Sequence, residues 1–285
     1  NTYSFSAGWN DFYVIKLDGS GNTQWEKTYG GGDYDEGFYV KQTSDGGYVV
    51  TGRTWSFGAG KADIWILKLD GSGNAQWQKT YGGGDYDDGF CIDPTSDGGY
   101  VVTGSTRSYG AGSSDLWVLK LDNSGNIQWQ KTYGGSDSDN GQSIQQTLDG
   151  GFVVAGSTIS GGNADLWVLK LDNSGNTKWQ KTYGESSQDF GYSVRQTSDG
   201  GYVVTGNTRS YGAGDEDLWV IKLDNSGNIP GCSGITITDT TISPANSTCI
   251  PATSPASPSS ISSTIDSTFV SGTDSNAVTT FQCTD

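Results

Sequence analysis

A repetition of about 52 residues constrains this 285-residue chain more than any other feature of its sequence. One aromatic position recurs at steps of 52, 52, 50 and 52 residues, and a second tryptophan position recurs in parallel. The two sets are Tyr13, Trp65, Trp117, Trp167 and Trp219, and Trp25, Trp77, Trp129 and Trp179. A fixed period near fifty residues is typical of propeller blades or solenoid repeats. The fold therefore depends on one repeat and on how its copies pack.

Each copy of the repeat predicts four short strands. In one copy they cover residues 116–121, 127–133, 142–146 and 152–156. The first strand, LWVLKL, is apolar on both faces, which indicates that it is covered on both sides, as in stacked blades. The turn LDNSGN joins the first two strands and the turn TLDGG joins the last two, and an Asp-Gly pair is a strong hairpin signal.

The repeated elements carry a family resemblance. The order Asp, aromatic, Lys-Leu-Asp, Gly-Asn, Tyr-Gly-Gly, Asp-Gly-Gly, Val-Val, Gly-x-Thr resembles the bacterial and archaeal seven-bladed β-propeller repeats and, more loosely, the kelch blade. The resemblance implies a secreted or surface protein. It also implies that each blade starts with the third strand of one copy and ends with the second strand of the next. The chain departs from the family in holding about four and a half copies.

We predict an all-β chain with two parts. Residues 1–230 form a β-propeller of about four to five four-stranded blades, and residues 231–285 form a Ser/Thr-rich C-terminal segment with β-strands, a donor strand or a stalk. The first strand occurs five times and every other strand four times. The ring therefore either closes within the chain, with a surplus at 218–224 or in the tail, or takes strands from the tail or a neighbouring molecule.

Composition narrows the partners and the location. The net charge of −16 argues against nucleic acid, because binding phosphates needs clustered Lys and Arg. No apolar run approaches the length of about 20 residues that a membrane helix requires. The lysines recur singly at repeat positions and are expected to pair with the repeat aspartates. Asn1 starts in the middle of a repeat, so we expect an upstream secretory signal and a secreted or cell-surface protein.

Cysteine usage and one glycosylation sequon agree with an oxidising compartment. Cys232, Cys249 and Cys283 lie in the tail and are disulfide candidates, and Cys91 is either a buried thiol or a tie to the tail. A zinc site is not expected, because the chain has no histidine and no paired cysteine spacing. Asn246 begins the sequence Asn-Ser-Thr, an acceptor for N-glycosylation.

Acidic residues alternate with other residues in the link between the second and third strands. The pairs are Asp33 and Asp35, Asp85 and Asp87, and Asp137 and Asp139. Alternating oxygen ligands followed by glycine are typical of calcium loops, so these six residues are candidate calcium ligands and calcium is the candidate cofactor. The competing interpretation is that they cap turns, pair with the lysines or are solvated. A further repeated acid before the first strand is expected to accept backbone hydrogen bonds: Asp11, Asp63, Asp115, Asp165 and Asp217.

Two functional interpretations lead. The first is an extracellular structural protein, a self-assembling filament or surface-layer subunit that forms a homo-oligomer or homopolymer by exchange of terminal strands. The second is a cell-surface β-propeller that binds a glycan or a protein through the loop aromatics Trp9, Trp55, Tyr109 and Tyr211. A hydrolase or lyase ranks third, and we predict that the chain is not an enzyme, because without histidine no Ser-His-Asp or Cys-His arrangement exists.

Overall fold

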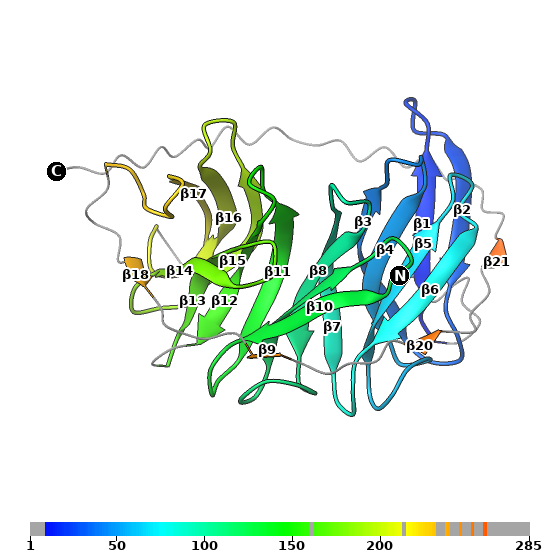
Figure 1. Cartoon of the computed structure of the whole chain (residues 1–285), viewed down its shortest axis with the longest axis horizontal. Helices are drawn as coiled ribbons and strands as arrows, with labels where there is room; N and C mark the ends of the chain where they lie inside the picture. The colour runs from blue at the N-terminus through cyan, green and yellow to red at the C-terminus, as the bar shows by residue number, and fades with distance from the viewer. Residues whose placement is uncertain are drawn as a thin grey trace.

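The computed structural model describes residues 9–159, 162–212 and 215–231, and four short strands between residues 237 and 260 (Figure 1). All paired strands in these ranges are antiparallel, apart from isolated single bridges. None of the described residues belongs to a helix that could cross a membrane. The described part of the chain is therefore all-β, as predicted.

Three consecutive sheets hold four repeat strands each, in chain order. The first consists of β3 (Asp35–Gln42), β4 (Tyr48–Thr54), β5 (Asp63–Leu69) and β6 (Ala75–Tyr81). The second consists of β7 (Asp87–Pro94), β8 (Tyr100–Thr106), β9 (Asp115–Leu121) and β10 (Ile127–Tyr133). The third consists of β11 (Asp139–Gln146), β12 (Phe152–Ile159), β13 (Ala164–Leu171) and β14 (Thr177–Tyr183). This order confirms that the link between the second and third strands of a repeat passes from one sheet to the next.

An incomplete sheet stands at each end of the repeats. At one end β1 (Phe12–Leu17) pairs with β2 (Thr23–Tyr29), and at the other β15 (Asp189–Gln196), β16 (Tyr202–Thr208) and β17 (Asp217–Leu223) form three strands. In Figure 1 β1 and β2 lie on the right-hand side, β7 and β8 near the middle, and β11 to β17 on the left-hand side. The described strands thus match the predicted imbalance of five first strands against four of each other kind.

The strands at the two edges of a sheet have different surroundings. The first strands of the four later sheets, β3, β7, β11 and β15, contact one another in succession, and we call them the inner strands. The fourth strands, β6, β10 and β14, together with β2, lie at the opposite edge, and we call them the outer strands. Each inner strand has a bulge, for example between Gly89 and Cys91, which bends the strand and increases its twist.

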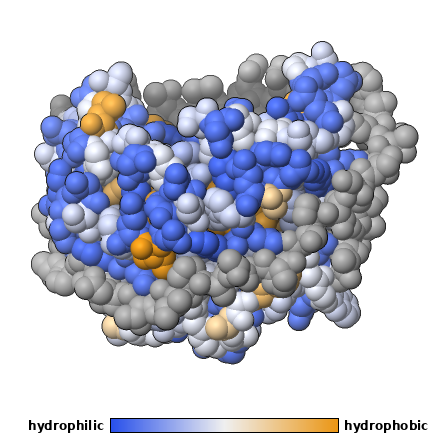
Figure 2. Space-filling model, turned by 45° about the vertical axis from the view of Figure 1, so that its right-hand side comes forward, coloured by the Kyte–Doolittle hydropathy of each residue, from blue (hydrophilic) through white to orange (hydrophobic). Residues whose placement is uncertain are grey.

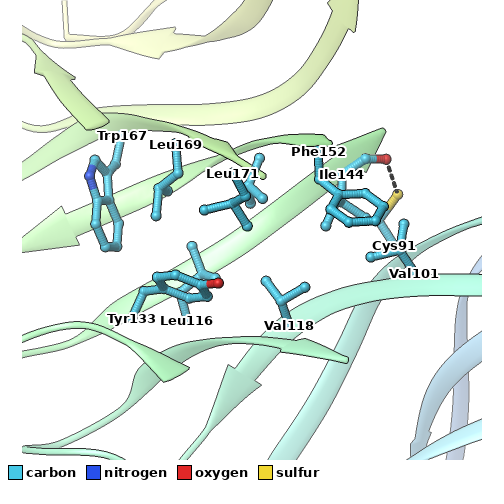
Figure 3. Packing of buried hydrophobic residues seen from close by; sticks show 11 residues of the cluster. Cys91, Val101, Leu116, Val118, Tyr133, Ile144, Phe152, Trp167, Leu169 and Leu171 are labelled. Atoms are coloured by element: carbon cyan, nitrogen blue, oxygen red, sulfur yellow. Dashed lines mark hydrogen bonds between the residues drawn. The ribbon is translucent and has the colours of Figure 1, made fainter. Parts of the chain in front are cut away.

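Successive sheets pack face to face through apolar side chains. Leu116 and Val118 on one face of β9 lie against Trp167, Leu169 and Leu171 of the next sheet, and all five are fully buried (Figure 3). The alternate residues of β9 pack against the preceding sheet. Every residue of β9 is buried, which confirms the prediction that this strand is covered on both sides.

A second, polar contact joins each outer strand to the next sheet. Trp129 Nε1 donates to the carbonyl of Asn173 at 3.1 Å, Lys131 Nζ donates to Asn176 Oδ1 at 2.7 Å, and Tyr133 OH donates to the carbonyl of Gly175 at 2.6 Å. The same three bonds recur at the other three junctions, from β2, β6 and β14. The Trp-x-Lys-x-Tyr pattern of the outer strand is thus explained by the hydrogen bonds that these three side chains donate to the LDxSGN turn of the next sheet.

The repeated lysines fall into two groups. Lysines of β5, β9, β13 and β17, the first strands of the repeats, pair with the aspartate of the TxDGG turn, as predicted. In one such pair Lys120 Nζ lies 2.9 Å from Asp97 Oδ2. The equivalent pairs are Lys68 with Asp45, Lys170 with Asp149 and Lys222 with Asp199. Lysines of the outer strands donate a hydrogen bond to the asparagine of the next turn, and that asparagine donates to the aspartate of the same turn. These lysines therefore partner the repeat aspartates through asparagine, and their positive charge helps to lower the pKa of those aspartates.

The described strands of the tail lie on the outer strands. β18 (Ile237–Asp239) pairs with β14, β19 (Ala245–Asn246) with β10, β20 (Ala252–Thr253) with β6, and β21 (Ser259–Ser260) with β2. The tail thus adds a short strand to four of the five sheets, within the same chain. The predicted stalk or donor segment beyond residue 260 lies outside the described residues.

Candidate functional site

The acidic loops place the two members of each candidate calcium pair in different surroundings. Asp87 is buried, and its carboxylate accepts from Gly83 N at 2.9 Å and Ser108 Oγ at 2.6 Å. Asp35 likewise accepts from Gly31 N, Ser56 Oγ and Thr54 Oγ1, and Asp139 accepts from Gly135 N. These carboxylates hold the start of each inner strand to its neighbouring loops.

The first member of each pair faces outward. Asp33 and Asp137 are exposed, and Asp85 Oδ1 accepts from Lys61 Nζ at 2.9 Å. Within the described ranges no three acidic side chains converge, so the six residues do not build one oxygen cage there. Calcium binding stays a prediction. A thermal unfolding midpoint that rises in excess calcium over chelator would support it, and an unchanged midpoint would contradict it.

A pair of carboxylates that the sequence analysis did not connect is buried between sheets. Asp63, at the start of β5, and Asp87, at the start of β7, both face Gly82. A Cβ on Gly82 would lie 1.7 Å from Asp63 Oδ1 and 2.8 Å from Asp87 Oδ2, so only glycine fits there. Asp63 Oδ2 accepts from Ala59 N, as expected for the repeated acid, while no residue in the described ranges gives Asp63 Oδ1 a hydrogen bond.

The surroundings of this pair favour the protonated carboxyl. Burial, to which the charge of Asp87 adds, raises the pKa of Asp63 to about 7. At the next two junctions burial and the neighbouring inner-strand aspartate raise the pKa values of Asp115 and Asp165 to about 6. These three carboxyls therefore change protonation state nearer to neutral pH than an ordinary aspartate does.

Four aromatic side chains form a row on the loops at one end of the structure. Trp9 stacks on Tyr34 with ring centroids 5.7 Å apart, and Trp55 meets Tyr34 and Tyr86 edge-on at 6.2 and 6.5 Å. We call Trp9, Tyr34, Trp55 and Tyr86 the aromatic row. The later repeats carry Ser138 and Gln188 in place of the two tyrosines, so the row breaks the symmetry of the repeat.

Cationic side chains accompany the row. Arg53 Cζ lies 4.7 Å from the ring centroid of Trp55, and Lys61 Nζ lies 4.8 Å from that of Tyr86. Arg53 is held by ion pairs to Glu36 and Asp88. Aromatic faces beside fixed polar groups are typical of sites that bind small polar ligands.

The four predicted ligand-face aromatics separate into two groups. Trp9 and Trp55 belong to the aromatic row, and Trp9 is exposed. Tyr109 and Tyr211 pack on Trp117 and Trp219 with centroids 5.3 and 5.2 Å apart, and Tyr109 OH donates to the carbonyl of Gly82. The structure thus places these two tyrosines within the packing of their own repeats.

The inner strands of the first complete sheet and the last sheet meet. Arg195 of β15 donates from Nη2 to the hydroxyl of Tyr39 on β3 at 3.1 Å, and from Nη1 to Ser143 Oγ at 3.3 Å. Lys41 and Asp93 form an ion pair at 3.4 Å on the neighbouring inner strands. The four inner strands therefore converge, although they belong to sheets at different places along the chain.

The two end sheets expose apolar side chains whose counterparts in the three complete sheets are buried. Leu218 and Val220 of β17 are 79% and 57% exposed, whereas Leu116 and Val118 are 0% exposed. At the other end Ile15 and Leu17 of β1 are 40% and 47% exposed, whereas Leu67 and Leu69 are fully buried. We call these two surfaces the end faces. In the view of Figure 2 the described surface is mostly hydrophilic, with a few separate hydrophobic patches.

The candidate cysteines and the glycosylation site lie mostly in the tail. Cys91 is a buried free thiol whose Sγ lies 3.8 Å from the carbonyl oxygen of Ile144 (Figure 3), and burial raises its pKa. Cys232, Cys249 and Cys283, and any disulfide between them, lie outside the described residues. Asn246 belongs to β19, where its backbone is the partner of Lys131.

Comparison with known proteins finds no family model that matches the chain and no curated protein that matches it significantly. The resemblance to seven-bladed β-propeller repeats therefore stays a prediction.

Proposed function

We propose that this chain is an extracellular structural protein, a subunit of a filament or surface layer that joins further copies head to tail through its end faces. We also propose that its repeats are the blades of a β-propeller of about four to five blades that is left open between β1 and β17. The convergence of the inner strands through Arg195 and Tyr39 supports that architecture.

The end faces carry the proposal. Inside the molecule Leu166 and Val168 of one sheet pack against Ile221 and Leu223 of the next. At the two ends, Leu218 and Val220 occupy the places of the first pair, and Ile15 and Leu17 those of the second. The end faces are therefore the two halves of a contact that the chain already makes at every internal junction.

A second copy is the occupant that fits both faces at once. One copy offers the face of β17 and the next offers the face of β1, so the contact is heterologous and repeats in one direction. Burying apolar area of this kind contributes about 25 cal/mol per Å². Heterologous contacts give a closed ring or an open filament, depending on the rotation between copies.

The substitution pair Leu218→Glu and Val220→Glu tests the proposal. Because these side chains are exposed within one copy, the pair is expected to abolish assemblies in sedimentation velocity and to leave the unfolding midpoint unchanged. Leu148→Glu is the matched control, since Leu148 is 86% exposed on a turn away from both end faces. Assemblies that survive the pair, or that Leu148→Glu also removes, would contradict the proposal.

The aromatic row favours a second candidate function, binding of a glycan. Stacked and edge-on aromatic rings with cations beside them could hold the apolar face of a sugar ring and its hydroxyls. Glycan binding should then weaken at least tenfold in Trp55→Ala and stay unchanged in Tyr192→Ala, whose exposed tyrosine lies on β15. Equal binding by the two variants on a glycan array would contradict this candidate.

A further inference from the structure

The four described tail strands all pair with the same two positions of the outer strands. Each outer strand ends in Lys-Thr-Tyr, and the tail strand lies opposite its lysine and threonine. The threonine pairs are Thr182 with Thr238, Thr132 with Ala245, Thr80 with Ala252, and Thr28 with Ser259. The outer strands thus present one backbone surface four times.

The tail meets these surfaces at a constant step. Residues 238, 245, 252 and 259 are seven residues apart, while their partners 182, 132, 80 and 28 are 50 or 52 residues apart in the opposite direction. One heptad of tail therefore corresponds to one sheet. Seven extended residues can span up to about 25 Å.

The tail sequence carries the same period. Three of the tail residues that pair with the outer-strand threonines directly follow a proline, namely Pro244, Pro251 and Pro258. The fourth, Thr238, follows Ile237. Proline has no N–H and is confined to edges or to the start of strands. In β19, β20 and β21 the described pairing begins at the residue that follows the proline in the sequence.

We propose that the outer strands β2, β6, β10 and β14 form a single peptide-binding track that recognises a strand with a seven-residue period. Its occupant is the set of described tail strands β18, β19, β20 and β21 of the same chain, one for each outer strand, which we call the strap. The three-stranded sheet with β17 has no outer strand among the described residues, and no described tail strand pairs with it. Each of the four described outer strands thus pairs with one of the four described tail strands. This inference stands independently of the proposed assembly.

The strap has a physical role. Unpaired backbone N–H and C=O groups along an open sheet edge can pair with another chain. A strand paired with that edge covers these groups. Because one segment binds four sheets in succession, it resists their separation as well as their unfolding.

Engineered disulfides in the full chain test the register. In a background with Cys232, Cys249 and Cys283 changed to Ser, Thr80→Cys with Ala252→Cys is expected to form an intramolecular disulfide in most molecules. Thr132→Cys with Ala245→Cys is expected to do the same. The matched control is Thr80→Cys with Ala245→Cys, which combines the same residue types one heptad out of register.

Three outcomes would overturn the inference. They are absence of the two in-register disulfides, equal formation in the control, and disulfides that join two copies, seen as doubled mass on a non-reducing gel. The last result would assign the track to the tail of a second copy. In-register intramolecular disulfides, with at least tenfold less in the control, would establish the strap.

Discussion

Asp63 shows at the scale of one residue how the junctions between sheets respond to pH. Its pKa is about 7 in the folded chain, above the ordinary value of about 3.9. Between these values the folded state holds a proton that the unfolded state has lost, so stability falls as pH rises from about 4 to 7. The contribution of one such group is at most about 1.4 kcal/mol per pH unit.

Asp63→Asn should therefore reduce the loss of unfolding free energy between pH 5 and pH 8. At pH 8 the variant should be the more stable protein, because the amide oxygen can still accept from Ala59 N and no charge faces Asp87. Urea unfolding at the two pH values measures this. Asp85→Asn is the control, since its pKa is lowered by its bond to Lys61. An unchanged pH dependence in Asp63→Asn would refute the assignment.

Tyr133 tests whether the hydrogen bonds from an outer strand to the next sheet stabilise the protein. Its buried hydroxyl donates to the carbonyl of Gly175, and burial raises its pKa far above the ordinary value. Tyr133→Phe leaves that carbonyl without its donor and should lower the free energy of unfolding by about 1–2 kcal/mol. Tyr192→Phe, on an exposed side chain, should cost nothing measurable by the same denaturation experiment. Equal costs would show that the bond does not stabilise the junction.

At the scale of the element, the bulged inner strand decides which glycines are required. A Cβ on Gly104 would lie 1.7 Å from the carbonyl oxygen of Asp88, opposite the bulge of β7. Gly104→Ala should therefore destabilise by about 2–4 kcal/mol, through displaced backbone. Gly84→Ala is the control, because nothing lies within 4 Å of its Cβ position. A Gly104→Ala protein as stable as the control in thermal unfolding would contradict the bulge geometry.

The same bulge explains where strand prediction from the sequence ended early. The third strand of one repeat was predicted over 142–146 and extends over Asp139–Gln146. The added residues are small or polar, and pairing continues across the Gly141–Gly156 contact on the far side of the bulge. Apolar periodicity found the four strands of each repeat, because it reports packing. It could not find residues held only by backbone bonds and side-chain caps.

The two-residue tail strands β19, β20 and β21 were missed for a related reason. Two-residue strands such as Ala252–Thr253 have no apolar alternation, and their register comes from backbone pairing with β6. The seven-residue spacing of Pro244, Pro251 and Pro258 is the signal that could have revealed them.

Candidate site residues divide in the same way. The sequence indicates Trp9 and Trp55 because they break the repeat. It does not single out Tyr34 and Tyr86, which stand between the repeated aspartates of the loop. The Asp63–Asp87 pair joins residues of different sheets. Only the packing of those sheets brings the two carboxylates to the same glycine.

At the scale of the whole molecule, each of the two end faces carries the apolar side chains of one half of an internal contact between sheets, and these side chains are exposed. The tail strap covers the edges of the outer strands, and the end faces of β1 and β17 keep exposed apolar side chains. Assembly through these faces would extend the internal packing from one copy to the next. Closure of a ring within one copy would satisfy the same faces in a different way.

One cross-linking measurement distinguishes these arrangements. Copies carrying Val220→Cys are mixed with copies carrying Ile15→Cys, in the background with Cys232, Cys249 and Cys283 changed to Ser, and the disulfide-linked products are weighed by mass spectrometry. Head-to-tail assembly predicts a dimer that contains one copy of each kind, and no dimer from either variant alone. A single chain carrying both cysteines that cross-links only within itself would contradict assembly and show that the ring closes on its own.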